Sequence, residues 1–400
     1  MIKILVLTST FPRFEHDSVP RFILDLTKEL ENNAIHSTVL APHHMGARLE
    51  EYMNGVEVVR YRYAPQKLER LAYGAGILPN IKANPLLSFL IPLFVLAQIF
   101  SIIKLAHTKK FSIIHAHWLI PQGVSLWACS WALPKKTKLI LTIHGTDQIV
   151  SSSHFLSSFK RVILRKFDII TTVSTPITKE IQQLLNRAEK NNVITAPMGI
   201  DDFFLHSPPN KQSPVTSIIC VGRLVEEKNP LLVLKAFSLI AEKDKVRLHF
   251  AGLGPEMEKL ISEIERLKLT NYVTMHGHLS HSELCSLLQS THIIVQASDH
   301  EGLGLAVLEG MACGNVPILA DYPAATDLVE SGENGFIFSR GSESELRKHI
   351  EVLLQTPSLR SDMANRAREK AASFSWKNTA MLYKKIYSEL LLFSDSPTEY

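Results

Sequence analysis

Cysteine is scarce in this 400-residue chain, which contains four cysteines that lie far apart. No two of them form a Cys-x-x-Cys pair, and no histidine lies at a spacing that would complete a zinc site. We therefore expect no bound metal, and we expect the thiols to be buried and reduced. The four are Cys129, Cys220, Cys285 and Cys313.

The chain also lacks a large excess of one charge. It contains 43 Lys and Arg and 39 Asp and Glu, which give a formal net charge of +4. No basic run carries interleaved aromatic side chains, so nucleic acid is not an expected partner. The first residues form a short strand-like run, without the long apolar core and small-residue cleavage site of a secretory leader. These absences favour a cytoplasmic protein.

Length and composition indicate a globular protein with two domains, since 46% of the residues are hydrophobic and 20% are charged. Strand-like apolar runs alternate with amphipathic stretches, which is typical of parallel βαβ units. In the first half, strands are predicted at 2–8, 37–41, 56–61, 113–116, 139–143, 169–173 and 193–195, and helices at 20–32 and 175–186. In the second half, strands are predicted at 218–221, 247–251, 273–276, 293–296, 317–320 and 335–338.

A polar, proline-bearing stretch, residues 206–214, interrupts this alternation and is predicted to be a linker. We therefore expect an α/β fold with two doubly wound, Rossmann-like domains, residues 1–206 and 207–375. Ligands of such sheets bind outside the carboxyl ends of the strands, so the expected site is a cleft between the two sets of strand ends.

The most informative motif follows the predicted strand at 293–296. It is the turn Glu301-Gly302-Leu303-Gly304-Leu305, which leads into a helix that carries Glu309 about two turns along. A helix N-terminus preceded by small residues binds phosphate through unpaired backbone N–H groups. The two carboxylates can accept hydrogen bonds from hydroxyls on either side of that phosphate. A diphosphate between two polyols is a nucleotide sugar, although an isolated pair of this kind is more often a helix cap and a solvated side chain.

A second turn of this kind follows the strand at 218–221. Gly222 and Arg223 form the turn, and Lys228 precedes the next helix. These two cations suit a pyrophosphate clamp, because Arg makes forked contacts and Lys acts as a point charge. A third turn, residues 252–254, begins like a dinucleotide fingerprint, but Met257 replaces the last glycine, so no nicotinamide or flavin cofactor is expected.

Together these motifs resemble the retaining glycosyltransferases of family four, which have the GT-B fold. The family pattern is a glutamate, seven residues and a second glutamate, preceded by a Gly-Arg turn with a lysine; Gly222, Arg223, Lys228, Glu301 and Glu309 match it. The resemblance implies a metal-independent hexosyltransferase that uses a GDP- or UDP-linked sugar. In it, Arg223 and Lys228 neutralise the leaving diphosphate, Glu309 binds the ribose hydroxyls, and Glu301 holds the sugar.

The same resemblance implies further site residues. His144, which follows the strand at 139–143, would contact the transferred sugar, and Asp147 is a weaker candidate because Asp is common in helix caps. The turn at His276 and Gly277 would meet the nucleotide base. The amphipathic tail, residues 376–400, would return to the first domain as a crossing helix.

Acceptor-side candidates lie at other strand ends of the first half. His117 and Trp118 follow the strand at 113–116, and His115 points the same way as His117, but no third ligand supports a metal site. Many family members carry glycines in the loop after the first strand, whereas residues 9–20 contain none. We therefore expect Arg13 in that loop to supply charge or to meet the acceptor, with phosphate binding left to the second domain.

The longest apolar run, residues 86–105, is compatible with a buried helix, a helix on the membrane surface or a transmembrane span. A basic and aromatic stretch before it, 61–67, suits a lipid headgroup. The favoured acceptor is thus a hydroxyl of a polyprenyl-linked or other envelope glycan, with the enzyme at the inner face of the plasma membrane. A soluble-acceptor transferase resembling sucrose or glycogen synthases, a sugar nucleotide epimerase of the same fold and a nucleotide-sugar-binding module remain alternatives.

Overall fold

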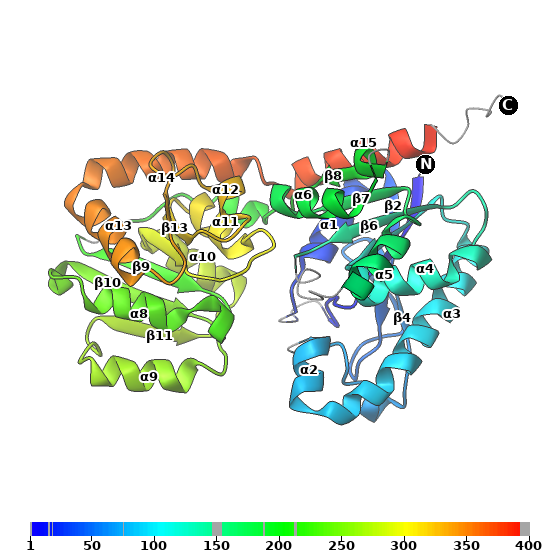
Figure 1. Ribbon diagram of the computed structural model, residues 1–400, viewed down its shortest axis with the longest axis horizontal. Helices are drawn as coiled ribbons and strands as arrows, with labels where there is room; N and C mark the ends of the chain where they lie inside the picture. The colour runs from blue at the N-terminus through cyan, green and yellow to red at the C-terminus, as the bar shows by residue number, and fades with distance from the viewer. Residues whose placement is uncertain are drawn as a thin grey trace. The chain divides into compact units, whose positions relative to one another are not determined.

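The computed structural model describes residues 2–14, 17, 19–74, 76–145, 154–186, 189–211 and 214–392. The chain divides into two compact units, Met1–Pro197 with Trp376–Tyr400, and Met198–Ser375 (Figure 1). The boundary between the units thus lies before the predicted linker at 206–214. The reason is that α7 (Asp202–Leu205) packs on α11 (Leu305–Ala312) of the second unit. Helix α15 (Trp376–Leu392) belongs to the first unit, where it contacts α1 (Phe22–Asn32). Residues 393–400 of the predicted returning helix lie outside the described residues.

The first unit contains an eight-stranded sheet in the order β3-β4-β2-β1-β5-β6-β7-β8. Each neighbouring pair is parallel except β3 and β4, which are antiparallel. Its strands are β1 (Ile2–Leu7), β2 (Ile35–Pro42), β3 (Glu50–Met53), β4 (Val56–Tyr61), β5 (Ile113–His117), β6 (Lys138–Ile143), β7 (Ile169–Thr172) and β8 (Val193–Thr195).

The second unit contains a six-stranded parallel sheet in the order β11-β10-β9-β12-β13-β14. Its central strands are almost continuously apolar and buried, as expected for a parallel sheet covered by helices on both faces. The strands are β9 (Thr216–Val221), β10 (Val246–Ala251), β11 (Val273–Gly277), β12 (Ile293–Gln296), β13 (Val316–Ala320) and β14 (Phe336–Phe338).

Helices cover both sheets. The first unit also has α2 (Ile77–Ala83), α3 (Ile91–Lys109), α4 (Val124–Cys129), α5 (His154–Leu164) and α6 (Thr175–Leu184). The second unit also has α8 (Pro230–Ser238), α9 (Met257–Arg266), α10 (His281–Ser290), α12 (Ala325–Leu328), α13 (Glu343–Gln355) and α14 (Pro357–Ala372). Shorter helical segments are η1 (Gln66–Leu68), η2 (Pro85–Leu90), η3 (Leu119–Gly123), η4 (Ser130–Ala132), η6 (Glu189–Asn192), η7 (Glu226–Lys228) and η8 (Lys243–Lys245).

The predicted α/β class with two doubly wound sheets is confirmed. Every predicted strand and both predicted first-half helices are present, with ends that differ by at most two residues from the predicted ranges. The antiparallel edge strand β3 was not predicted.

The apolar run at 86–105 forms η2 and α3. One face of α3 packs against β2, β4 and α4 of the first unit, and there Phe94, Gln98, Ile102 and Leu105 are buried. The opposite face is exposed, and only 17% of the most apolar 18-residue window within Pro85–Lys109 is buried. The alternative of a buried helix is therefore wrong.

Candidate functional site

The donor-site residues predicted in the second unit gather at one edge of its sheet. Strands β11, β10, β9 and β12 are neighbours, and their carboxyl ends lead to the turns at Gly277, Gly252, Gly222 and Ser298. The two predicted phosphate motifs follow β9 and β12, which pair directly with each other. Residues that are about 75 positions apart in the sequence thus meet because their strands are adjacent and parallel.

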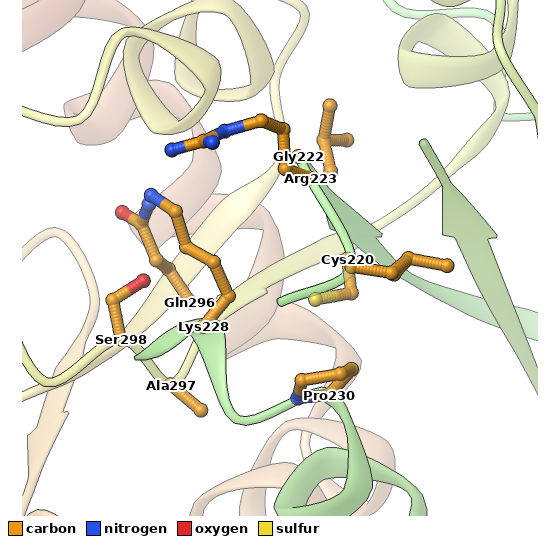
Figure 2. A pocket seen from close by; sticks show the side chains of 10 residues that line it. Cys220, Gly222, Arg223, Lys228, Pro230, Gln296, Ala297 and Ser298 are labelled. Atoms are coloured by element: carbon orange, nitrogen blue, oxygen red, sulfur yellow. The ribbon is translucent and has the colours of Figure 1, made fainter. Parts of the chain in front are cut away.

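A pocket lies between the ends of β9 and β12. In Figure 2 the polar ends of Arg223, Lys228 and Gln296 point to the same side of this pocket, while Cys220 and Pro230 lie on the other side. Gln296 and Ser298 were not predicted as site residues. The residues that line the pocket are Cys220, Val221, Gly222, Arg223, Leu224, Lys228, Pro230, Gln296, Ala297 and Ser298.

The carboxylate of Glu301 is held by three donors. Lys228 Nζ forms an ion pair with Glu301 Oε1, Gln296 Nε2 donates to the same oxygen over 2.5 Å, and Ser298 Oγ donates over 3.1 Å. Three hydrogen bonds fix the carboxylate beside the pocket, so it can accept hydroxyl hydrogen bonds with little reorganisation.

Asn229 ties the two loops of the pocket together. It adopts a left-handed conformation with φ of 49°, between η7 and α8. Its side-chain amide donates to the carbonyl oxygen of Ala297 over 3.0 Å and to Asp299 Oδ1 over 2.9 Å. The loop that carries Arg223 and Lys228 is thereby fixed to the loop that carries Glu301. The sequence signal for this link is an Asn between a lysine and a proline, because Asn adopts the left-handed conformation more readily than most residues.

The N-terminus of α11 lies next to these loops. Gly304 precedes the helix with φ of 98°, and no side chain of the described residues caps it. A Cβ atom at Gly304 would lie 3.1 Å from Gln296 Oε1 and 3.3 Å from the hydroxyl of Tyr322. Glycine therefore permits both the positive φ and the close approach. The first N–H groups of α11 are thus not capped by a side chain of the described residues, and their binding of an anion stays a prediction.

Glu309 lies one turn into α11, because the helix begins at Leu305 rather than earlier in the turn. The prediction of about two turns was too long. Burial by the surrounding protein, together with the nearby carboxylate of Asp201, raises the pKa of Glu309 to about 8. A carboxyl group that gains its charge near neutral pH is typical of functional sites, since a ligand can shift its ionisation.

Two glycines of the turn after β10 have a packing role. A Cβ atom at Gly252 would lie 1.9 Å from the carbonyl oxygen of Gly222, and one at Gly254 would lie 2.2 Å from that of Leu224. Backbone hydrogen bonds join the same turns, from Gly222 N to Ala251 O over 2.9 Å and from Leu224 N to Leu253 O over 3.0 Å. The glycines thus support the phosphate turn.

His276 and Gly277 end β11. This end lies beside the turn at Gly252, because the backbone N–H of Gly252 donates to Gly277 O over 2.7 Å. His276 Nε2 lies 3.0 Å from His249 Nδ1. Burial lowers the pKa of His276, and burial together with His276 and Arg247 lowers the pKa of His249 to about 4. Both rings are therefore neutral near pH 7 and can serve as hydrogen-bond donors and acceptors.

In the first unit, the predicted histidines and Trp118 form one cluster at the ends of β5 and β6. His117 Nδ1 lies 2.9 Å from His144 Nε2, and the rings of Trp118 and His144 have centroids 4.8 Å apart. His115 lies behind them, with ring nitrogens 2.8 Å from Tyr387 Oη and 2.6 Å from Thr142 Oγ1. The cluster thus connects the C-terminal helix α15 to His144.

Burial sets the charge of this cluster. It lowers the pKa values of His115 and His144 to about 3 each, and that of His117 well below 6.5. All three imidazoles are therefore neutral at physiological pH. Nε2 of His117 is buried and has no hydrogen-bond partner among the described residues.

Arg13 pairs with an acidic residue of its own loop, and its predicted role toward the acceptor stays a prediction. Its guanidinium forms a forked ion pair with Asp17, with two contacts of 2.7 Å, and lies over the rings of Phe14 and Tyr73. A guanidinium bound in this way shapes its own loop and is not a free positive charge. Asp147, the weaker candidate near His144, lies outside the described residues.

The thiols are free in all four cysteines, and Cys129, Cys285 and Cys313 are buried, whereas Cys220 lies on the pocket wall and is partly exposed. In the part of the chain that the structure describes, no three His, Cys, Asp or Glu side chains are grouped to bind a metal ion.

Two family profiles match the chain. The profile described as Glycosyltransferase Family 4 matches residues 19–202, and the one described as Glycosyl transferases group 1 matches residues 202–370. The chain belongs to this family of glycosyltransferases and is an enzyme with the GT-B fold.

Similar proteins agree with this assignment. The N-acetyl-alpha-D-glucosaminyl L-malate synthase of Bacillus anthracis is 23% identical over 78% of this chain and 84% of its own length. Sucrose-phosphate synthase from Thermosynechococcus elongatus has a TM-score of 0.80 at 18% identity, covering 99% of this chain and all of that one. The Anabaena protein Alr3699/HepE, solved with UDP and glucose, has a TM-score of 0.72 at 18% identity, covering 97% and 100%.

Proposed function

We propose that this glycosyltransferase moves a hexose from a nucleoside diphosphate sugar to a hydroxyl group, with retention of anomeric configuration and without a metal ion. The observation that supports this most is the pocket at the ends of β9 and β12, where Arg223 and Lys228 lie beside the fixed carboxylate of Glu301. The complex of the Anabaena protein with UDP and glucose supports a nucleoside diphosphate sugar as the donor.

In the proposed reaction, the diphosphate binds Arg223, Lys228 and the first N–H groups of α11. These positive groups stabilise the charge that develops on the leaving phosphate, a role for which other transferases use a metal ion. When Lys228 contacts the phosphate, Glu301 keeps its bonds from Gln296 and Ser298 and accepts from the sugar hydroxyls. Glu309 accepts from the ribose hydroxyls. The C1–oxygen bond to the leaving phosphate breaks while the acceptor oxygen attacks C1 from the same face, and the acceptor proton passes to the leaving phosphate oxygen.

His144 is proposed to contact the transferred sugar. As a neutral imidazole it donates or accepts one hydrogen bond, and His117 Nδ1 at 2.9 Å from its Nε2 sets the ring orientation. His117 and Trp118 are proposed acceptor-side residues.

The test is product formation from a panel of UDP- and GDP-sugars, with NMR of the anomeric proton of the product. We expect the donor configuration to be kept and the rate to be unchanged by EDTA. Glu301→Ala should lower kcat/KM by about a hundredfold or more, whereas Glu265→Ala, on the exposed part of α9, should not. An inverted product or an EDTA-sensitive rate would refute this part of the proposal.

We also propose that the acceptor is a lipid-linked glycan, which places the enzyme at the inner face of the plasma membrane. The exposed apolar face of α3 supports this over a soluble acceptor. Membership of a glycosyltransferase family argues against the epimerase and binding-module alternatives. Transfer to a polyprenyl-phosphate-linked sugar in detergent, compared with the corresponding free sugar, tests the acceptor. Equal transfer to the free sugar would favour the soluble-acceptor alternative.

A further inference from the structure

We infer that the first unit docks on a bilayer containing anionic phospholipids through an exposed apolar surface, here called the docking face. It is formed by η2, α3 and η4, and in Figure 1 α3 runs along the edge of the unit beside α4. This inference does not depend on which donor the enzyme uses. The side chains that define the docking face are Leu86, Phe89, Leu93, Leu96, Phe100 and Trp131.

The docking face has helical periodicity. Its first five residues recur at intervals of three and four, so they lie along one side of η2 and α3. Phe89 is 76% exposed and Phe100 is 69% exposed. Single exposed apolar residues are normal on the surface of a soluble protein, but a row of large apolar side chains marks an interaction site.

Trp131 extends the docking face at the C-terminal end of α3. It is 84% exposed and lies in η4, which is fixed to α3 by a contact of 2.9 Å between His107 Nε2 and the carbonyl oxygen of Ala132. An exposed Trp beside an apolar helix is typical of side chains that lie at the headgroup level of a membrane.

The packing of α3 distinguishes a surface helix from a span. Phe94, Gln98 and Ile102 on its other side are buried in the first unit. A helix that crossed the bilayer would have to withdraw these side chains from their contacts with β2, β4 and α4. The helix therefore lies along the membrane plane, with its apolar face in the headgroup and acyl boundary.

Charge identifies the partner. From Arg70 to Thr146 the sequence contains eight Lys and Arg and not one Asp or Glu, although the whole chain is nearly balanced. Lys109 and Lys138 form ion pairs with Glu57 and Asp168. The other lysines of this segment are exposed, and the described residues offer them no ion pair; they are Lys82, Lys104, Lys110, Lys135 and Lys136.

A bilayer with anionic headgroups satisfies both properties, since it accepts apolar side chains and attracts lysines within a Debye length of its surface. A second copy of the chain fits less well. A two-fold interface would place the same patch against itself and bring these lysines toward one another.

The test is flotation of the full chain with phosphatidylcholine vesicles, with and without phosphatidylglycerol. We expect binding to the anionic vesicles that weakens in high salt. The variant Phe89→Ser/Leu93→Ser/Phe100→Ser should bind at least about tenfold more weakly. Its matched control, Val162→Ser/Leu239→Ser/Met381→Ser, removes apolar side chains that are 50 to 54% exposed elsewhere and should bind like the wild type.

The charge is tested by Lys82→Gln/Lys104→Gln/Lys135→Gln, which should weaken binding by about fivefold per lysine. Lys243→Gln/Lys245→Gln/Lys259→Gln in the second unit is its control. Stabilisation by UDP or GDP, measured by thermal shift, reports folding and the donor site in every variant. Vesicle binding can therefore be refuted while the proposed transferase function stands, and the transferase function can be refuted while vesicle binding stands.

Several results would overturn the inference. These are wild-type protein that stays in the soluble fraction, equal binding to neutral and anionic vesicles, or equal loss in the variants and their controls. Self-association that the Phe89 variant abolishes, without vesicle binding, would assign the docking face to a second copy. Retention in the vesicles after alkaline carbonate extraction would indicate a span.

Discussion

Lys228 donates a hydrogen bond to Glu301 across the ends of β9 and β12, so the cation proposed for the diphosphate directly contacts the carboxylate proposed for the sugar. Lys228 lies on a short 3₁₀ segment after β9, and Glu301 lies in the turn before α11. Because Gln296 and Ser298 also donate to Glu301, this carboxylate stays fixed when Lys228 turns to another anion. The pair links the two motifs into one site.

Replacing this lysine should affect catalysis far more than stability. We expect Lys228→Ala to lower kcat/KM by about a hundredfold, because one positive group is lost where charge develops. Stability should fall by less than about 1 kcal/mol, since the side chain is partly exposed to water. Lys235→Ala, which removes an exposed ion pair with Glu343, is the matched control and should leave kcat/KM unchanged. Comparable losses of activity in both variants would contradict the assignment.

The ionisation of Glu309 should appear in nucleotide binding. Burial raises its pKa to about 8, so most of the carboxyl group is protonated at pH 7. Ribose hydroxyls donate more strongly to a carboxylate, so binding favours the ionised form. The affinity for UDP or GDP should therefore rise with pH between about 6.5 and 8.5, at most about tenfold per pH unit. Calorimetry should show this rise in the wild type and a flat profile in Glu309→Gln; identical profiles would refute the role.

The histidine cluster should make the first unit sensitive to acid. Burial lowers the pKa of His115 to about 3, whereas an unfolded histidine titrates near 6.5. Below about pH 6.5 the unfolded state binds a proton that the folded state excludes. The stability contributed by the neutral ring is thus present above that pH and is lost as the pH falls toward 3.

We expect His115 alone to lower the free energy of unfolding by about 2 kcal/mol when the pH falls from 6.5 to 5. Urea unfolding at the two pH values should show a smaller pH dependence in His115→Gln than in the wild type. His278→Gln changes an exposed histidine and provides the comparison. An unchanged pH dependence in His115→Gln would mean that the buried ring does not contribute.

The turn at Gly252 should tolerate no side chain. Gly252→Ala adds a Cβ atom 1.9 Å from the backbone oxygen of Gly222, at φ of 139°. Gly222→Ala has a similar φ of 142° but meets open space, so it isolates the backbone strain. We expect about 1 to 3 kcal/mol of destabilisation from strain in both variants and a larger loss in Gly252→Ala. Thermal or urea unfolding of the two variants measures the difference, and equal losses would show that the clash is relieved.

Much of the fold was predictable because parallel strands buried on both faces give short apolar runs with clear ends. Strand β3 was missed because Glu50, Glu51 and Tyr52 show no apolar pattern. Its signal is the dipeptide Asn54-Gly55, whose φ values of 50° and 86° form the tight hairpin turn to β4.

The site was predictable where backbone geometry demands a residue type and unpredictable where it depends on tertiary contacts. Arg223, Lys228 and Glu301 belong to turns with glycines, which the sequence marks. Gln296 ends a buried strand, and only the arrangement of Tyr322, Gly304 and Glu301 around it shows its role. The binding of Arg13 to Asp17 depends on a loop conformation for which no sequence pattern was available.

The most direct test of the donor site is a crystal structure of the enzyme with a nucleoside diphosphate sugar. We expect the diphosphate within hydrogen-bond distance of Arg223, Lys228 and the first N–H groups of α11, with the ribose hydroxyls on Glu309 and the sugar hydroxyls on Glu301. A nucleotide bound elsewhere in the second unit, or phosphates that contact neither cation, would contradict it.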